Sequence, residues 1–579
     1  MKTADEIRAR ILSVVAKNGG HLASSLGAVE IALALRDVFD PWKDRIVWDV
    51  GHQAYAWKIL TGRDDRFGTL RQLDGVAPFP NPAESAADAA VAGHAGSALS
   101  VALGMAAARD RTGAGGHVVA VVGDASIVNG HSFEALNNCA AATEKVIVVL
   151  NDNDMAISKP TGSFAKFLGR LITGVRYNRV KAAAEAAGHR LRLTFLRSLY
   201  HRVESRVKGL FLGSRYFEQY GLRYIGPVDG HDLAALKAAF TVAKEDKRSV
   251  LVHVVTKKGK GYAPAERAPT TYHGVGAGAL ARLPRADGDG RQDWSAAFGD
   301  RIVRAARADA RICALTAGMK DGTGLAPFAR AFPSRFFDVG IAEGHMVAFA
   351  AGLAASGLRP VVCVYSTFLQ RAVDQVVHDV ALPNLPVVFC VDRAGVVGAD
   401  GATHQGVFDL ALFRAVPNLT ICQPCDGEEL AHLLGAAFRR NGPTLIRYPR
   451  GLCPAPRGLA GDGLAVEVAN PAAVVQVWAT GDELDKALAV SARTGVGVVY
   501  ARSLKPFDAA LLARQRAAGK RIVSLENACV LGGFGEAIGA DVRLGWPDVF
   551  IPHGAVADLE RRYGLDVDSI VAKVVALGD

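Results

Sequence analysis

The chain has 579 residues, of which 50% are hydrophobic and 21% charged, with 62 glycines, 24 prolines and a formal net charge of +10. This length exceeds what one hydrophobic core accommodates, so we expect several domains, and the composition excludes a largely disordered protein. No apolar run is long enough to cross a bilayer and no nucleic-acid-binding signature accompanies the positive charge, so we expect neither a membrane nor a nucleic acid as partner.

The first segment, residues 1–275, alternates helical stretches with apolar runs of strand length. Its start, M-K-T-A-D-E-I-R-A-R, carries charges of both signs and no apolar leader, which predicts a cytoplasmic protein. The alternation predicts a parallel sheet covered by helices. Residues 160–215 are basic without a clear period, which fits either a mobile insertion near the site or a solvated helical excursion. The strand-like runs are residues 46–50, 117–122, 146–150 and 250–255.

Two polar residues follow neighbouring strands of this predicted sheet. Asp124 in V-V-G-D-A-S and Asn153 in V-V-L-N-D-N-D-M each come after a buried apolar run. Ligands bind at the carboxyl ends of such strands, and a carboxylate with an amide oxygen suits Mg²⁺, which also coordinates phosphate oxygens. Gly123 lets backbone N–H groups approach phosphates, and the helix predicted over E-A-L-N-N favours anions at its N-terminus. The alternative is an ordinary strand-to-helix turn without a ligand.

A linker over 276–293 leads to a second α/β segment, residues 294–450, and a joint over 451–465 leads to a third, residues 466–579. We expect the third segment to be structural and regard it as a candidate dimer interface. The predicted fold class is α/β, with three domains that each hold a mainly parallel sheet flanked by helices. Cys422 and Cys425 form a C-x-x-C, for which small buried thiols are a better explanation than metal or redox chemistry. The strand-like runs of the second segment are residues 361–364, 387–391, 419–422 and 445–448.

Long phrases in the first two segments match one known family. The first carries H-L-A-S-S-L-G-A-V-E, W-D-V-G-H-Q-A-Y and T-K-K-G-K-G-Y-A-P-A-E, and the second carries F-D-V-G-I-A-E-G-H, V-Y-S-T-F-L-Q-R, D-R-A-G-V-V-G-A-D-G-A-T-H-Q-G and R-Y-P-R-G. Together they closely resemble the 1-deoxy-D-xylulose-5-phosphate synthases of the transketolase superfamily. Those enzymes join pyruvate to glyceraldehyde 3-phosphate with loss of CO₂, and their product is a precursor of isoprenoids and of thiamin.

This resemblance implies a transketolase-like fold, thiamin diphosphate and Mg²⁺ as cofactors, and a homodimer. It assigns the diphosphate and metal to residues 1–275 and the cofactor's pyrimidine to residues 294–450. Two alternatives stay open. One is a divergent carboligase that uses the same cofactor with another donor or acceptor, and the other is a non-catalytic paralogue.

The resemblance also implies the cofactor contacts. Asp124, Asn153 and the main-chain carbonyl of Met155 would hold the metal, and Glu343 would lie against the aminopyrimidine. The alternative for Glu343 is a carboxylate that merely complements a helix dipole. The residues implied in cofactor binding are His52, Gly93, His94, Gly123, Asp124, Ala125, Ser126, Asn153, Lys258, Glu343 and Phe368.

The chain departs from the family pattern at four of its positions. Ala125 replaces a glycine, and its methyl group would cost about 1–2 kcal/mol if the backbone there needs positive φ. Ala95 and Gly96 stand where the family usually has more hydroxyl groups. Gly344 replaces a glutamine, which would loosen the support of Glu343.

Substrate contacts follow from the same phrases. Arg393 and Arg450 would grip the acceptor phosphate, since one guanidinium makes two hydrogen bonds to a phosphate; the alternative for each is a surface salt bridge. Histidines can hold a carboxylate and move protons near neutral pH. Asp400 and His404 lie four positions apart, so one would orient the other. The implied catalytic residues are Glu343, His21, His52, His273 and His404, and the implied substrate-binding residues are Tyr365, Arg371, Arg393, Asp400, His404 and Arg450.

Overall fold

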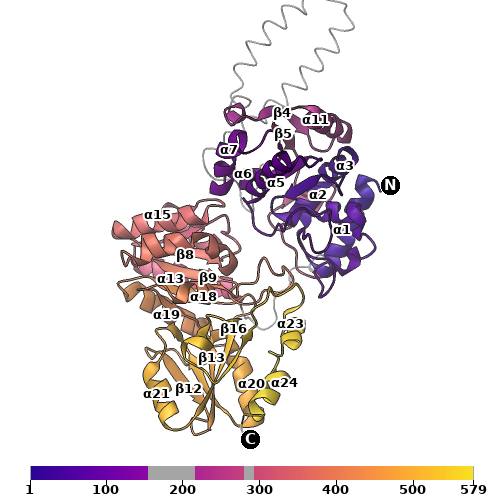
Figure 1. Ribbon diagram of the computed structural model, residues 1–579. Helices are drawn as coiled ribbons and strands as arrows, with labels where there is room; N and C mark the ends of the chain where they lie inside the picture. Colours follow the sequence, from indigo (N-terminus) through magenta and orange to yellow (C-terminus); the bar gives the residue numbers. More distant parts are fainter. Residues whose placement is uncertain (1, 154–215, 279–291, 578–579) are drawn as a thin grey trace, which may run out of the picture. The chain divides into compact units, whose positions relative to one another are not determined.

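Three sheets, each mainly parallel and flanked by helices, form the protein and confirm the predicted fold class (Figure 1). The computed structural model describes residues 2–153, 216–278 and 292–577. Contacts group the chain into two compact units, Met1–Arg71 with Gly75–Leu283 and Gln72–Asp74 with Pro284–Asp579. The basic segment 160–215, Met155 and most of the linker 276–293 lie outside the described residues, and the domain boundaries stay a prediction.

The first unit holds a five-stranded sheet in the order β1-β2-β3-β5-β4, with every neighbouring pair parallel. All four runs predicted as strands are found in it. The prediction missed β4, where glycine and proline at 226 and 227 interrupt the apolar pattern of a partly exposed edge strand. The strands are β1 Arg45–Trp48, β2 Val118–Gly123, β3 Ile147–Asp152, β4 Arg223–Asp229 and β5 Val250–Val255; the helices are α1 Ala4–Asn18, α2 Leu22–Gly27, α3 Val29–Val38, α4 Tyr55–Lys58, α5 Ala98–Thr112, α6 Asp124–Ile127, α7 Gly130–Ala142, α11 Leu233–Glu245 and α12 Ala263–Arg267.

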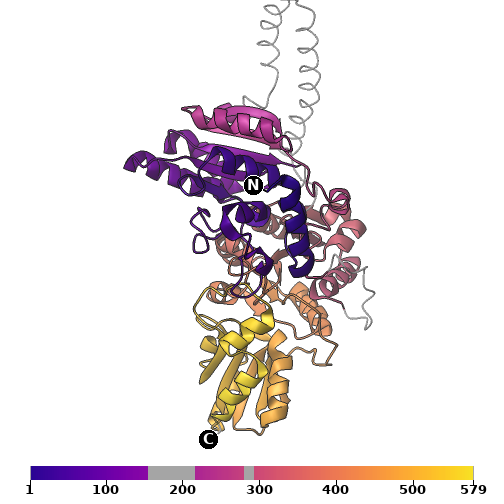
Figure 2. The ribbon, with the colours of Figure 1, turned by 90° about the vertical axis from the view of Figure 1, so that its right-hand side faces the viewer.

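Helices cover both faces of this sheet (Figure 2). Val119 and Val121 of β2 pack with residues of α1, α3 and α11, whereas Val118 and Ala120 pack with residues of α5 and α7. A strand that is buried on both faces has a continuous apolar sequence, which is why these strands could be predicted from their composition.

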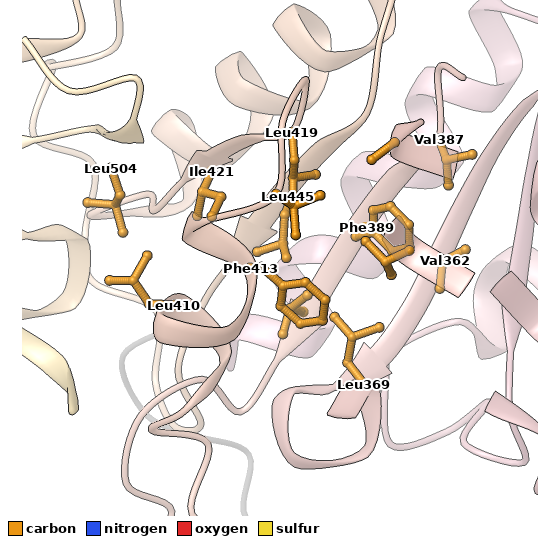
Figure 3. Packing of buried hydrophobic residues seen from close by; sticks show 14 of the residues in the cluster. Val362, Leu369, Val387, Phe389, Leu410, Phe413, Leu419, Ile421, Leu445 and Leu504 are labelled. Carbon is orange, nitrogen blue, oxygen red and sulfur yellow. The ribbon is translucent and has the colours of Figure 1, made fainter. Parts of the chain in front are cut away.

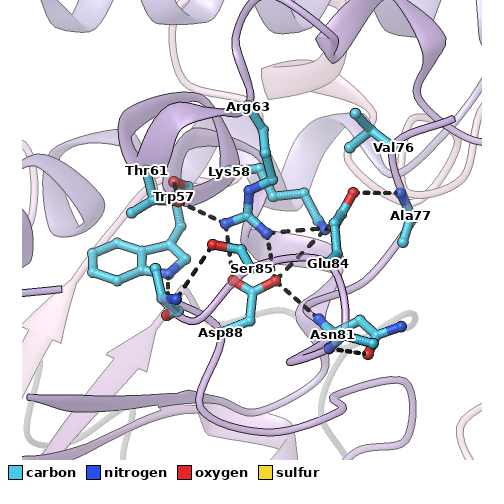
Figure 4. A network of polar contacts seen from close by, with 12 residues as sticks. Trp57, Lys58, Thr61, Arg63, Val76, Ala77, Asn81, Glu84, Ser85 and Asp88 are labelled. Carbon is cyan, nitrogen blue, oxygen red and sulfur yellow. Dashed lines mark hydrogen bonds and ion pairs between the residues drawn. The ribbon is translucent and has the colours of Figure 1, made fainter. Parts of the chain in front are cut away.

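A buried ion-pair cluster fixes the segment 76–88, which leads to the predicted cofactor-binding loop (Figure 4). Arg63 donates hydrogen bonds of 2.5 and 2.9 Å to the two carboxylate oxygens of Asp88. Lys58 pairs with Glu84, and its Nζ lies 3.8 Å from Asp88 Oδ2. The carboxylates also accept backbone N–H groups of the segment. Two cations therefore balance two carboxylates where little water is present.

The second unit holds the other two sheets, in the orders β15-β10-β11-β9-β8-β6-β7 and β12-β14-β13-β16-β17. The only antiparallel pairs among their described strands are β15 with β10 and β12 with β14. The strands are β6 Ile312–Thr316, β7 Phe336–Asp338, β8 Arg359–Tyr365, β9 Val388–Asp392, β10 Thr420–Cys422, β11 Thr444–Arg447, β12 Ala465–Ala469, β13 Val475–Thr480, β14 Gly497–Ala501, β15 Ser503–Lys505, β16 Arg521–Cys529 and β17 Val542–Trp546. The longer helices are α13 Trp294–Ala308, α14 Ala326–Ala331, α15 Glu343–Ala355, α18 Asp409–Arg414, α19 Gly427–Arg439, α20 Leu484–Thr494, α21 Ala509–Ala517, α23 Val556–Tyr563 and α24 Val567–Val575; the shorter ones are α16 Ser366–Leu369, α17 Val373–Gln375 and α22 Phe534–Ala537.

One apolar core joins these two sheets (Figure 3). Leu504 of β15 belongs to the same cluster as Ile421 of β10 and Leu410 of α18, and the cluster extends to Trp478 and Ile522 of the third sheet. Because side chains of both sheets share this core, the second and third segments form a single compact unit.

The cysteines behave as the sequence analysis expects. All eight are buried free thiols, and burial raises the pKa of Cys422 and of Cys425 to about 12. None of the helices in the described parts of the chain is both long and apolar enough to span a bilayer.

Candidate active site

The residues predicted for the site fall into two groups, one in each compact unit. The first group, at the carboxyl edge of the first sheet, contains the predicted metal ligands Asp124 and Asn153 and most of the predicted histidines. The second group lies on α15 and in the loops that follow strands of the seven-stranded sheet. It contains the predicted catalytic carboxylate and the substrate contacts.

Asp124 and Asn153 stand at neighbouring strand ends, as predicted. Parallel strands β2 and β3 pair Gly123 with Asn151, so the residues that follow leave the sheet at the same edge. Asp124 is buried, and the buried Oδ1 of Asn153 accepts no hydrogen bond from any residue that the structure describes. Mg²⁺ prefers oxygen ligands, so an unsatisfied buried oxygen at the same sheet edge as a carboxylate fits this cation.

The neighbours of Asn153 on β3 already have partners. Asn151 donates to Gln53 Oε1 at 2.9 Å and accepts from Thr256 Oγ1 at 2.6 Å. Asp152 Oδ2 lies 2.9 Å from Nε2 of His253, a buried residue of β5. Among residues 151–153, the tertiary partners therefore single out the Oδ1 of Asn153 as the oxygen without a described hydrogen bond.

Two departures from the family pattern are accommodated by the backbone. Ala125 lies within α6 and is not among the described non-glycine residues with positive φ, so the penalty considered for its methyl group does not arise. Gly96 has a φ of +91°, and a Cβ there would lie 2.6 Å from the Asn129 side chain. Its N–H donates to Asp49 Oδ1 at 2.8 Å, which ties the loop to the end of β1. Position 96 thus requires glycine.

Lys258 joins this sheet edge from the loop after β5, the strand that pairs with β3. Burial lowers the pKa of Lys258 to about 8, although the negative charge of Asp124 opposes the shift. A buried cation near a carboxylate suits a diphosphate that is bound together with a metal. Gly93 and His94 lie in the loop that precedes α5, and Ser126 is buried in α6.

Three histidines from distant positions come together in the first unit. The ring centroids are 5.9 Å apart for His21 and His52, 5.6 Å for His21 and His273, and 5.2 Å for His52 and His273. Burial and the charges of His21 and Lys258 lower the pKa of His52 well below its usual value. Its Nδ1 lies 2.7 Å from the carbonyl oxygen of Val50, so the neutral ring carries its proton on Nδ1 and accepts hydrogen bonds at Nε2.

Glu343 is the first residue of α15 and is buried, and its contact with the aminopyrimidine stays a prediction. Arg371 Nη1 lies 3.5 Å from Glu343 Oε2, so a residue predicted for the substrate channel pairs with the predicted catalytic carboxylate. A Cβ on Gly344 would lie 3.3 Å from Gln375 Oε1. The segment that carries Arg371 and Gln375 therefore closes the space beside Gly344 and supports Glu343.

An aromatic row connects the predicted cofactor contact with the predicted phosphate contact. The Tyr365 and Phe368 rings stack with centroids 5.7 Å apart, and the His404 ring meets Phe368 edge-on at 5.6 Å. The Arg393 guanidinium lies 3.9 Å from the centre of the Tyr365 ring. Burial raises the pKa of Tyr365 to about 12 although Arg393 opposes the shift, so the hydroxyl stays protonated.

Arg450 and Asp400 lie near this row and influence the pKa of Tyr365. Arg450 Nη1 is 3.7 Å from Asp400 Oδ2, and the arginine side chain is 45% exposed. His404 Nδ1 lies 2.9 Å from Thr403 Oγ1. That Asp400 and His404 orient one another stays a prediction.

Two residues that the sequence analysis did not select hold the loop 393–406. Gln405 accepts the N–H of Val397 at 2.7 Å and donates to the carbonyl of Pro552 at 3.0 Å. Asn527 accepts another N–H of the loop at 3.1 Å. Gln405 could have been found from its place in the T-H-Q-G phrase, whereas no sequence signal connects Asn527 with this loop.

Matches to known proteins cover nearly the whole chain. Residues 1–256 match a family model described as 1-deoxy-D-xylulose-5-phosphate synthase, residues 291–456 the transketolase pyrimidine binding domain, and residues 464–570 the transketolase C-terminal domain. The 1-deoxy-D-xylulose-5-phosphate synthase of Desulforudis audaxviator is 46% identical over 600 residues, with 98% of this chain and 93% of that protein covered. The 1-deoxy-D-xylulose-5-phosphate synthase 1 of Geobacter metallireducens is 45% identical over 605 residues, with 99% and 95% covered.

Proposed function

Because the chain belongs to the 1-deoxy-D-xylulose-5-phosphate synthase family, we propose that it is a transferase that condenses pyruvate with D-glyceraldehyde 3-phosphate. The products are 1-deoxy-D-xylulose 5-phosphate, a precursor of isoprenoids and of thiamin, and CO₂. The identity of 46% to a synthase of that name, over 98% of this chain, carries the proposal. The geometry supports it, because the aromatic row places an arginine suited to a phosphate close to Phe368.

Thiamin diphosphate and Mg²⁺ are the cofactors of this proposal. The Asn153 oxygen that lacks a described partner supports a metal at the carboxyl edge of the first sheet. When bound, thiamin diphosphate supplies a carbon nucleophile and an electron sink for decarboxylation. Asp124, Asn153 and the carbonyl of Met155 would hold the metal, and Lys258 would neutralise diphosphate charge.

The second unit supplies the carboxylate for proton transfer. Glu343 would hold a proton at the cofactor's aminopyrimidine, and Arg371 orients that carboxylate from 3.5 Å. Phe368 offers a ring face to the pyrimidine. The histidines at 21, 52, 273 and 404 would bind the pyruvate carboxylate and move protons, and the low pKa of His52 makes it a neutral acceptor of hydrogen bonds.

Arg393 and Arg450 would bind the acceptor phosphate. The Arg393 guanidinium lies 3.9 Å from the centre of the Tyr365 ring, and its planar fork of N–H groups can make two hydrogen bonds to one phosphate. The Arg450 side chain is 45% exposed, with its Nη1 3.7 Å from Asp400 Oδ2, and it would bind the same ligand. The protonated Tyr365 hydroxyl adds a neutral donor.

The two alternatives gain no support from these comparisons. A divergent carboligase was considered because of the departures at Ala125, Ala95, Gly96 and Gly344. Neither alanine is among the described non-glycine residues with positive φ, and both glycines fit their surroundings. The homodimer and the cytoplasmic location that the family implies stay predictions.

Product formation tests the proposal. The wild type, Glu343→Ala and the equally sized Glu343→Gln are each incubated with pyruvate, D-glyceraldehyde 3-phosphate, thiamin diphosphate and Mg²⁺. We expect 1-deoxy-D-xylulose 5-phosphate from the wild type and a rate lower by about 10³-fold in both variants, with cofactor binding retained. A wild type that binds the cofactor without forming this product contradicts the substrates and favours another carboligase. A wild type that does not bind the cofactor favours the paralogue.

Acceptor choice is the second readout of the same assay. Replacing D-glyceraldehyde 3-phosphate with D-glyceraldehyde removes the phosphate that both arginines would bind. We expect kcat/KM to fall by about a hundredfold or more, because both arginines then lose the anionic group that they would bind. Equal use of both aldehydes would contradict the role of Arg393 and Arg450.

A further inference from the structure

A residue of the third sheet touches the loop that carries Arg393. Residues 393–406, named the acceptor loop, meet Asn527 of β16. We infer that Asn527 is a positioning residue for the acceptor phosphate, because it holds the acceptor loop and the end of β11 in the arrangement that places Arg393 and Arg450. The inference rests on the proposed function, in which these two arginines bind the phosphate.

Asn527 touches the acceptor loop through its side chain. Its Oδ1 accepts the N–H of Val396 at 3.1 Å. Gly395 lies so close to the carboxamide that a Cβ on it would overlap Asn527. Gly395 also exchanges two backbone hydrogen bonds of 2.7 Å with Gly406, which close the base of the loop. The carboxamide thus packs on the point where both arms of the acceptor loop meet.

The carboxamide of Asn527 is held in one orientation. Trp546 Nε1 donates to Oδ1 at 2.8 Å, and Nδ2 donates to Asp482 Oδ2 at 2.7 Å. Since Oδ1 faces two donors and Nδ2 faces a carboxylate, these partners also establish which atom is the oxygen. A rotation of the amide would leave polar groups without a hydrogen bond, so its contact with the loop is rigid.

Asn527 reaches the segment of Arg450 through its main-chain carbonyl. That oxygen accepts Arg447 Nη2 at 3.0 Å, and Arg447 is the last residue of β11, three positions before Arg450. Arg447 is fully buried and donates two hydrogen bonds of 3.0 Å to Asp409, which begins α18 soon after the acceptor loop. One residue of the third sheet therefore contacts both segments that carry the phosphate-binding arginines.

Arg393 needs this support for a physical reason. Its φ of 57° lies in the left-handed region, which residues with a side chain rarely adopt, so surrounding contacts have to maintain it. The next residue, Ala394, donates its N–H to the carbonyl of Tyr448 at 3.0 Å, and the two after it contact Asn527. Without Asn527 the backbone at 393 can relax, which moves the guanidinium from its place on Tyr365.

The test compares Asn527→Ala with Gln515→Ala in the full-length enzyme. Gln515 is a matched control because it is a buried amide of the same domain whose Oε1 accepts a tryptophan N–H, that of Trp478 at 2.9 Å. In Asn527→Ala we expect KM for D-glyceraldehyde 3-phosphate to rise about tenfold or more, since small misplacements of binding groups have large effects. In the same variant, KM for pyruvate and KM for D-glyceraldehyde should stay within about twofold of the wild type. In Gln515→Ala, KM for each of the three substrates should stay within about twofold.

The outcomes separate this inference from the proposed function. A wild type that forms no product refutes the proposed function. An active wild type with an unchanged KM for D-glyceraldehyde 3-phosphate in Asn527→Ala overturns the positioning role alone, and so does an equal rise for both aldehydes, which indicates general loosening. If Asn527→Ala does not fold, Asn527→Leu decides, because it roughly keeps the size of the side chain but removes the oxygen that accepts the Val396 N–H. A selective rise of the same KM then supports the role, and an unchanged KM overturns it.

Discussion

The two groups of predicted site residues, one in each compact unit and called the first and the second half, are built in different ways. Asp124, Asn153 and Lys258 follow three adjacent parallel strands of one sheet, so the order of β2, β3 and β5 alone brings them to one edge. Arg393 and Arg450 also follow strands, but the loop of Arg393 is held by a residue of another sheet. Substitutions in the first half should therefore act mainly at the ligand residues themselves. In the second half, a substitution in the neighbouring sheet can also displace the loop that carries Arg393.

The buried ion pairs near the two halves also differ, because one network has two cations for two carboxylates and the other has one cation for one carboxylate. Near the first half, Arg63 and Lys58 share the carboxylates of Asp88 and Glu84, so each anion keeps a partner if one cation is lost. Near the second half, the Asp409 carboxylate is paired with Arg447. Redundant pairing tolerates a loss that a single pair does not.

The largest effect is expected where a ligand residue of the first half is changed. Asp124→Asn keeps the shape but removes the carboxylate from the metal position, so we expect the Mg²⁺-dependent affinity for thiamin diphosphate to fall about a thousandfold, or roughly 4 kcal/mol. Titration calorimetry with and without Mg²⁺ measures it. The matched control is Asp152→Asn, because Asp152 pairs with a histidine on β5. Near-normal affinity in Asp124→Asn would place the metal elsewhere and break the comparison.

Removing one buried arginine from each ion-pair network tests whether a second cation protects the carboxylates. Arg447→Met leaves Asp409 buried without its arginine, and we expect local opening of the loop 393–406 to become about 3 kcal/mol easier. Arg63→Met leaves Lys58 to serve both carboxylates, so the effect on the segment 76–88 should be about half as large. Hydrogen exchange of peptides from both regions measures the two opening free energies. Equal losses would show that the second cation gives no protection.

The smallest effect is a dependence on pH in the second unit. Burial raises the pKa of Glu526 to about 7, although its hydrogen bonds from the Gly535 and Phe534 N–H groups oppose the shift. The native pKa lies above the ordinary 4.5, so the stabilisation that the protonated form gives below pH 4.5 is lost as pH rises towards 7. At 1.36 kcal/mol per pKa unit, the loss between about pH 5 and pH 7 is about 2 kcal/mol.

Glu526→Gln should remove this decline, because glutamine does not titrate. Hydrogen exchange of peptides from β16 at both pH values compares the variant with the wild type. An identical pH dependence in the two proteins would assign the titration to another group. Arg63 and Asp88, a buried ion pair of the first unit, mark a region where no change is expected.

Much of the fold was predictable because its signals are local. The strands of the first sheet are buried on both faces, so their sequences are continuous apolar runs, and the polar residues directly after them had to emerge at the sheet edge. Glu343 was selected through the family resemblance of its phrase and not through a local apolar signal, since the strand before it, β7, is short and half-buried. The strands that were missed include β4, interrupted by glycine and proline, and the three-residue β15, which crosses into a neighbouring sheet.

The sequence by itself determined the apolar strands, the order of the motifs and the residue types available for a metal, a phosphate and proton transfer. Only the tertiary structure decided that, among residues 151–153, an oxygen of Asn153 lacks a described partner, that Arg371 pairs with Glu343, that Ala125 is unstrained, and that Asn527 holds the acceptor loop. The physical reason is that burial patterns and turns depend on neighbours along the chain. Hydrogen-bond partners and charge pairs are set by residues that are distant in sequence and meet only after the sheets have packed.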